Sequence, residues 1–207
     1  MIRGVIFDLD GTLVDSGLDF DLIRSHMGLV DRRPILEAID AVGGARAERL
    51  WAILAEHEAR GVEQATLFPG VIEFLDELDL RGIRRGVLTR NSRLSVHATL
   101  ARFDIEMHAV HAREDGPVKP DPAGIWRICE TWGFRPSECV MIGDYRFDIE
   151  AGRQAGARTV LFTGGRKHSV LAEQERADFT LSSFAEASAF WRWAEGERKR
   201  MKDEGKE

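Results

Sequence analysis

The sequence predicts an α/β protein with a parallel β-sheet, helices on both faces of that sheet, and a small all-helical insertion after the first strand. Two observations indicate this fold class. Short apolar runs alternate with helix-like segments from residue 69 onward, which is typical of a parallel sheet. Residues 18–60, by contrast, show helical spacing and no strand-like run. We therefore expect a core formed by residues 1–15 and 69–207, and an insertion formed by residues 16–68.

The first strand is the apolar run Val5-Ile6-Phe7, which stops abruptly at Asp8. A run that is apolar at every position is expected for a strand buried on both faces. After it, residues 13–17 read as a loop.

The insertion shows three apolar patterns at helical spacing, and two glycines, Gly43 and Gly44, separate the second from the third. Pro34 suits the start of the second helix, and Gly61 suits the end of the third. A helical insertion beside the end of the first strand indicates a lid or cap over a site. The alternative is a set of ordinary packing helices. The apolar positions are Leu22, Ile23, Met27, Ile35, Leu36, Ile39, Val42, Leu50, Ile53 and Leu54.

The rest of the chain alternates between helices and strands. We expect strands at residues 86–89, 109–111, 139–142, 159–162 and 179–181. We expect helices at residues 71–81, 93–103 and 122–132, up to about residue 155, near 169–175, and at 184–195. Residues 195–207 include ten charged residues, which predicts a solvated helix end or a frayed tail.

Composition limits the class of protein. The chain has 207 residues, of which 43% are hydrophobic and 31% charged, as in ordinary globular proteins. No run of 18 apolar residues predicts a membrane span, and the run before Asp8 is too short for a signal peptide. Two cysteines, Cys129 and Cys139, are too few for a disulfide framework. We therefore expect a cytoplasmic protein with both thiols reduced.

The net charge of −6, from 29 basic and 35 acidic residues, argues against nucleic acid as a partner. A small anionic substrate remains compatible with this charge, because cations close to a site matter more than the total. The sequence carries no indication of an oligomeric state.

Two carboxylates stand at the end of the first strand. Asp8 and Asp10 are two positions apart in an extended segment, so their side chains point the same way. Their charges repel, which raises a pKa unless a cation lies between them. A hard ion such as Mg²⁺ fits oxygen ligands of this kind. Gly11 permits a tight turn or the close approach of a ligand, although an Asp-Leu-Asp-Gly turn without a ligand is the alternative.

Polar residues recur at the later strand ends. Thr89 ends one strand, and Lys119 lies in residues 116–122, a loop that contains three of the six prolines and is therefore stiff. The carboxyl ends of parallel strands converge on one rim, where ligands bind. We therefore expect one site that brings together Asp8, Thr89 and Asp144 at strand ends and Lys119 from its loop.

These motifs, taken in order, resemble those of the haloacid dehalogenase-like (HAD) hydrolase superfamily. They are Asp-x-Asp-Gly-Thr at 8–12, Thr89, Lys119 in Lys-Pro-Asp-Pro, and Gly-Asp-x-x-x-Asp at 143–148. The match extends from residue 1 to about residue 165. The helical insertion resembles that of subfamily I, which includes phosphoglycolate phosphatases. The resemblance implies a Rossmann-like core with a cap, and Mg²⁺-dependent hydrolysis of a small phosphorylated metabolite, with a phosphoglycolate-like substrate possible.

The resemblance also implies a role for each acid. Asp8 would be the nucleophile that forms an aspartyl-phosphate. Asp10 would be general acid and then general base, and would contact Mg²⁺ through its backbone carbonyl instead of its side chain. Asp144 would be the third protein ligand of the metal. Asp148 would bind the metal through water or accept a hydrogen bond, with Lys119 as a possible partner.

The phosphoryl oxygens would be held by Thr89 and Lys119 together with Gly11, Thr12, Arg90 and Asn91. Phosphoglycolate phosphatase-like members often carry Asn directly after the threonine. Here Arg90 follows Thr89 and Asn91 comes next, so either side chain is a candidate for the phosphate contact.

Other functions remain open at this level. A dehalogenase of the same superfamily lacks the second acid and is disfavoured by Asp10. A β-phosphoglucomutase-like phosphomutase would use the same core, and a non-catalytic binding module would keep the fold without turnover. His108, His111 and Glu114 have a loose metal-like spacing without an evident fourth ligand. Four residues of the insertion are candidates for contacts beyond the phosphate, with a solvated helix face as the alternative: Arg24, His26, Arg32 and Arg33.

Overall fold

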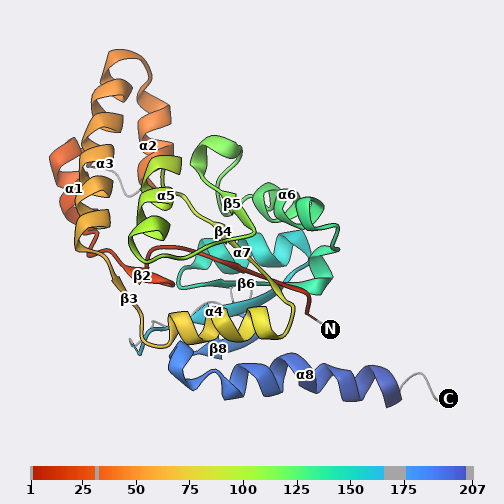
Figure 1. Ribbon diagram of the computed structural model, residues 1–207. Coiled ribbons are helices and arrows are strands. Elements are labelled where there is room, and N and C mark those ends of the chain that lie inside the picture. The colour runs from red at the N-terminus through yellow and green to blue at the C-terminus, as the bar shows by residue number, and fades with distance from the viewer. Residues whose placement is uncertain (1, 31–32, 166–175, 204–207) are drawn as a thin grey trace.

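A computed structural model describes residues 2–30, 33–165 and 176–203 of the chain. Its core is a six-stranded sheet in the order β5-β4-β1-β6-β7-β8, in which all neighbouring strands are parallel (Figure 1). The predicted fold class is therefore confirmed. The strands are β1 (Gly4–Phe7), β4 (Arg84–Leu88), β5 (Ala109–His111), β6 (Cys139–Gly143), β7 (Arg158–Phe162) and β8 (Phe179–Leu181).

The central strand β1 sets the position of the site. Phe7, its last residue, lies opposite Val87 of β4 and Ile142 of β6, so these three strands end at nearly the same level. The pairing continues one residue further, because the Asp8 amide donates to the Ile142 carbonyl at 2.9 Å. The residues that follow these strands therefore share one rim of the sheet.

Helices cover both faces of the sheet, as Figure 1 shows for α4 and α8 on one side and α6 and α7 on the other. Alternate residues of β1 belong to the two cores, since Phe7 packs into the first and Ile6 into the second. The helices of the first face are α4 (Val71–Leu80), α5 (Arg93–Arg102) and α8 (Ser188–Asp203). Those of the second are α6 (Ala123–Trp132) and α7 (Arg146–Ala155). Short 3₁₀ helices lie at η1 (Arg113–Asp115), η2 (Pro136–Glu138) and η4 (Phe184–Glu186).

An aromatic stack closes the first core. The Phe184 ring stacks on Phe162 with centroids 4.5 Å apart, and the Phe74 ring stacks on Trp191 at 5.3 Å. Phe74 and Phe184 also lie 5.0 Å apart, so η4 and α8 join the same cluster as α4 and β7. Aromatic pairs of this kind add to the free energy of burying their surface.

The insertion is helical, as expected, and consists of α1 (Phe20–Met27), α2 (Ile35–Val42) and α3 (Gly44–Gln64). These helices stand to one side of the core layers in Figure 1. They have a small apolar core of their own, formed by Ile23, Met27, Ile35, Leu36, Ile39, Leu50 and Leu54. The chain passes between core and insertion through β2 (Val14–Asp15) and β3 (Thr66–Leu67), which pair antiparallel next to the expected boundaries.

Three local expectations were wrong. The expected loop at residues 13–17 contains β2, which is too short to leave a pattern in the sequence. Gly61 does not end α3, because the helix continues to Gln64. A Cβ atom at Gly61 would lie 3.2 Å from Leu18 Cδ2, so the glycine lets the Leu18 side chain pack closely against the helix. The helix expected at residues 122–132 begins one residue later, at Ala123, because Pro122 is its N-cap; Asp121 Oδ1 accepts a hydrogen bond from the Ala123 amide at 2.8 Å.

The C-terminal helix also differs from the expectation. Residues 184–186 form the separate turn η4, and α8 continues to Asp203 instead of ending near residue 195. The helix expected near residues 169–175 falls outside the described residues. Across the described ranges, none of the helices combines the length and the apolar character that crossing a membrane requires.

Candidate active site

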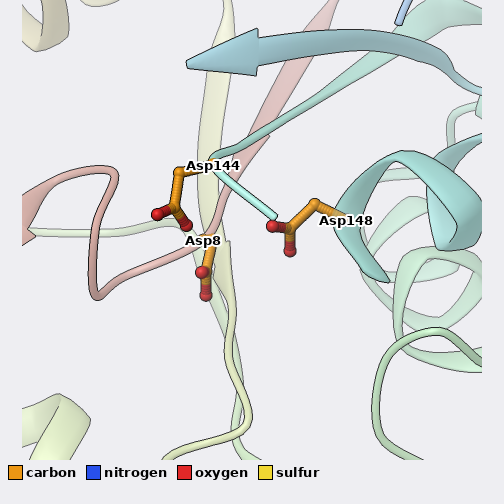
Figure 2. Close-up of side chains that lie close together, drawn as sticks. All are labelled: Asp8, Asp144 and Asp148. Carbon is orange, nitrogen blue, oxygen red and sulfur yellow. The ribbon is translucent and has the colours of Figure 1, made fainter. Parts of the chain in front are cut away.

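Three aspartates meet at the rim of the sheet. Asp8 follows β1, Asp144 follows β6, and Asp148 lies in the first turn of α7. Figure 2 shows their side chains lying close together, and one carboxylate oxygen of each lies within 4.8 Å of the others. The parallel register of β1 and β6 thus brings together acids that are more than a hundred residues apart in the sequence.

Two glycines allow this close approach. Gly11 has a φ of +81°, and a Cβ atom there would lie 2.2 Å from Asp144 Oδ2. A Cβ atom on Gly143 would lie 2.2 Å from Asp148 Cγ. A side chain at either position would therefore push the neighbouring aspartate out of place, because such contacts are far inside van der Waals distance.

Lys119 binds two of the three acids. Its Nζ lies 2.6 Å from Asp8 Oδ1 and 2.6 Å from Asp148 Oδ1, and its side chain is only 2% exposed. Burial alone would lower the pKa of Lys119, but the charges of Asp148 and Asp8 outweigh this effect and raise it. The lysine therefore stays charged beside Asp8.

Burial raises the pKa of Asp148 to about 6, and the charge of Asp8 acts in the same direction against the opposing effect of Lys119. Its Oδ2 accepts a hydrogen bond from the Tyr145 amide at 3.0 Å, which fixes the carboxylate at the start of α7. The negative charges of the three acids exceed the single positive charge of Lys119, so this cluster favours a further cation.

The three aspartates fit a hard divalent ion. All of their donor atoms are carboxylate oxygens, the ligands that Mg²⁺ prefers. Within the described ranges, this is the one group of three or more potential ligands that lie close enough to share an ion. Two of the three residues with loose metal-like spacing have other partners: His108 Nδ1 accepts from the Arg85 amide at 3.3 Å, and Glu114 accepts from the Arg93 amide at 2.8 Å.

Asp10 lies beside this cluster and lines the same cavity. Burial raises its pKa to about 6, and the charge of Asp8 adds to that effect, while hydrogen bonds from Ser16 and Asn91 act in the opposite direction. The Asn91 side-chain amide donates to Asp10 Oδ2. This contact orients a carboxyl group that can be protonated near neutral pH.

The three consecutive side chains of Thr89, Arg90 and Asn91 make contacts in different directions. Thr89 is buried at the end of β4, and its Oγ1 accepts from the Asn91 amide at 3.1 Å. Arg90 extends to the insertion, where its Nη2 lies 2.6 and 2.8 Å from the two carboxylate oxygens of Glu37 on α2. Asn91 therefore contacts the catalytic candidate Asp10, whereas Arg90 contacts the insertion.

The cavity above the aspartates has a volume of about 560 Å³. Core and insertion both contribute to its lining, and the insertion supplies Arg24, Ile35, Leu36 and Leu54 among others. Gly11 lines the cavity, whereas Thr12 is fully buried.

The four residues of the insertion that were candidates for contacts beyond the phosphate have different surroundings. Arg24 lines the cavity and donates to the Arg33 carbonyl. The Nδ1 of His26 lies 3.0 Å from Nε2 of His57, within the insertion itself. The Arg33 side chain is exposed, and Arg32 lies outside the described residues.

Two functional contacts escaped the sequence analysis, and both join the insertion to the core. Glu37 binds Arg90, as described above. Glu58 on α3 is 3% exposed and accepts hydrogen bonds from Ser92 Oγ at 2.7 Å and Ser95 Oγ at 3.0 Å, in addition to an ion pair with Arg113. A carboxylate on an amphipathic helix carries no signal in the sequence that distinguishes such a partner from solvent.

Comparisons with known proteins agree with this geometry. The family model of haloacid dehalogenase-like hydrolases matches residues 2–156. A haloacid dehalogenase-like hydrolase domain-containing protein of Arabidopsis thaliana is 33% identical over 172 residues, which cover 77% of this chain and 70% of that protein. Phosphoglycolate phosphatase of Haemophilus influenzae is 29% identical over 213 residues, which cover 87% of this chain and 94% of that enzyme.

Among solved structures, a predicted phosphoglycolate phosphatase from Haemophilus somnus superposes with a TM-score of 0.73. The superposition covers 92% of this chain and 98% of that one, at 23% sequence identity. At this identity the likeness establishes a shared fold.

Proposed function

Because the chain belongs to the haloacid dehalogenase-like hydrolase family, we propose that it is a Mg²⁺-dependent phosphatase acting on a small phosphate monoester. One observation supports this proposal most strongly. Asp8 lies within reach of both the ammonium group of Lys119 and the carboxylates of Asp144 and Asp148. Phosphoryl transfer depends mainly on positioning and on positive charge around the phosphoryl oxygens, and this arrangement can supply both.

The proposed metal ligands are the carboxylates of Asp8 and Asp144 and the backbone carbonyl of Asp10, with Asp148 binding directly or through water. When bound, Mg²⁺ would neutralise charge on the phosphoryl oxygens and lower their repulsion of Asp8.

In the first step, an Asp8 carboxylate oxygen attacks phosphorus. A bond forms between Asp8 and phosphorus, the bond from phosphorus to the substrate alkoxide breaks, and Asp10 donates its proton to that alkoxide. In the second step, Asp10 accepts a proton from water as the water oxygen attacks phosphorus. The acyl phosphate of Asp8 is cleaved, phosphate leaves, and both aspartates return to their starting states.

Other residues would hold the substrate during these steps. Lys119 and Thr89 are proposed to bind phosphoryl oxygens, and the ion pair between Lys119 and Asp8 holds the Asp8 carboxylate in place. Asn91 would orient Asp10 through the hydrogen bond described above. Gly11 would contribute from the loop after β1, whereas Thr12, which is fully buried, would not contact the substrate through its side chain. The insertion is proposed to act as a cap that covers the cavity and excludes water during the reaction.

The substrate class follows from the size of the site and from its relatives. A cavity of about 560 Å³ suits a small phosphorylated metabolite. Because relatives include enzymes named phosphoglycolate phosphatase, phosphoglycolate is the first compound to test. We also propose a cytoplasmic location, supported by the free and buried thiols of Cys129 and Cys139.

A phosphate-release assay tests this function. The purified protein is incubated with phosphoglycolate, sugar phosphates, nucleotides and p-nitrophenyl phosphate, first with Mg²⁺ and then with EDTA. We expect phosphate release with Mg²⁺, its loss with EDTA, and its return when Mg²⁺ is added back. Activity that persists in EDTA would remove the metal from the proposal. Conversion of a sugar 1-phosphate to an isomer without phosphate release would identify a phosphomutase instead.

A further inference from the structure

One side chain links the insertion to two parts of the active-site rim. Arg90 Nη2 lies 2.6 and 2.8 Å from the two oxygens of Glu37, a pair in which the side chains are 19% and 38% exposed. Arg90 Nη1 donates to the backbone carbonyl of Lys119. The guanidinium also lies 5.0 Å from the ring centroid of Phe147, which stands between Asp144 and Asp148 in the sequence.

These contacts occupy the guanidinium of Arg90. Its charge is neutralised by a carboxylate of the insertion, and its Nη1 donates to a backbone carbonyl of the core. Arginine suits such a role because its planar fork of donors binds two groups in fixed directions at once. Its sequence neighbours Thr89 and Asn91 meanwhile lie on the site itself, since Asn91 donates to Asp10.

The contact between α3 and the core is more deeply buried than the Glu37–Arg90 pair of α2. Glu58 is 3% exposed and accepts from two serine hydroxyls as well as from Arg113, whose guanidinium lies 4.9 Å from the ring centroid of Trp51. This contact has several donors and little exposure to water, so breaking it is costly. The Glu37–Arg90 pair is more exposed and lies near the cavity, so breaking it costs less.

We propose that Arg90 is a positioning residue that latches the insertion in its closed position. In this proposal the insertion turns about the Glu58 contact of α3, and its α2 side moves away from the rim when Glu37 releases Arg90. When the insertion closes, Glu37 fixes the guanidinium, and the guanidinium then fixes the Lys119 carbonyl at the base of the lysine that binds Asp8. Closure also removes water, which strengthens the ion pair. The effect on turnover rests on the proposed phosphatase function, whereas the latch itself does not.

A double-mutant cycle tests the latch. We would compare the Glu37→Gln and Arg90→Gln variants, the double variant, and Asp40→Asn as a matched control on the exposed side of α2. With p-nitrophenyl phosphate and Mg²⁺, each single variant should lower kcat/KM by about 10-fold, with changes in both kcat and KM. The double variant should resemble either single variant, because each residue acts through the other. The control should remain within about two-fold of the original chain.

Hydrogen exchange supplies a readout that needs no substrate. In Glu37→Gln, the amides of α2 should exchange several-fold faster than in the original chain, whereas those of α3 should keep their protection. If no phosphate ester is hydrolysed by the original chain, the proposed function fails, and the exchange result still decides whether the latch exists.

Three results would overturn the latch. The first is unchanged α2 exchange and unchanged kinetics in Glu37→Gln while Arg90→Gln loses activity, since Arg90 would then act on the phosphate directly. The second is a double variant whose loss equals the product of the two single losses, which means that the two residues act independently. The third is an equal effect of Asp40→Asn, which would assign the change to the overall charge of α2.

Discussion

The core rim and the insertion line the same cavity, but their charged groups are held in different ways. At the rim, Lys119 is almost fully buried and touches two carboxylates that are fixed by strand and helix ends. In the insertion, two carboxylates lie at the boundary with the core. Glu37 and Glu58 each form an ion pair with an arginine of the core. The rim is therefore set by the sheet itself, whereas the position of the insertion depends on a few side-chain contacts that can be changed one at a time.

The largest expected effect comes from the rim. Replacing the proposed nucleophile, Asp8→Asn, should lower turnover on the order of 10⁴-fold or more, because the amide cannot form the acyl phosphate. Steady-state phosphate release measures the loss. The secondary structure, followed by circular dichroism, should not change, because the substitution keeps the size of the side chain. A variant with full activity would exclude Asp8 as the nucleophile.

A smaller effect is expected where the insertion is anchored. Glu58→Gln removes the buried charge that pairs with Arg113 and should lower the free energy of unfolding by about 2–3 kcal/mol. Urea denaturation measures this change. Glu63→Gln is a matched control, because Glu63 is an exposed residue of the same helix and its substitution should change stability by less than about 0.5 kcal/mol. Equal effects of the two variants would show that Glu58 is not an anchor.

The smallest expected effect is on the pH dependence of stability, and it comes from a histidine of the core. Burial lowers the pKa of His111 at the end of β5; the charge of Asp115 opposes this shift, and those of Arg127 and Arg93 add to it. The imidazole is then neutral in the folded chain and takes up a proton on unfolding below about pH 6.5. Its contribution to stability is therefore present above that pH and is lost as the pH falls toward the lowered value.

Urea midpoints at pH 7.5 and pH 5.5 measure this contribution. The midpoint should fall further on acidification in the original chain than in His111→Gln, which has no group that titrates at this position. An identical fall in both proteins would assign the acid sensitivity to other groups, for example His57 of the insertion, whose pKa is also lowered by burial.

The core could be predicted from the sequence because its signals are local. The acids of the rim directly follow apolar runs that are buried strands, and the prolines around Lys119 mark a stiff loop. Parallel strand ends then converge by geometry alone. For these reasons, the sequence was enough to predict which residues would meet at the rim.

The contacts of the insertion could not be predicted, because they join residues without a local pattern. Glu37 and Arg90 are 53 positions apart, and Glu58 and Arg113 are 55 apart. The sequence also left open whether Arg90 or Asn91 faces the phosphate. The structure separates their directions, since Asn91 binds Asp10 and Arg90 binds Glu37.

The aromatic stack of the first core matters for anyone who shortens this chain. The family model ends at residue 156, yet Phe184 and Trp191 cover the rings of Phe162 and Phe74. A truncated version that stops after β7 would expose the rings of Phe74 and Phe162 to solvent as a hydrophobic patch. Such a fragment should aggregate during expression even though it still contains every residue of the aspartate cluster.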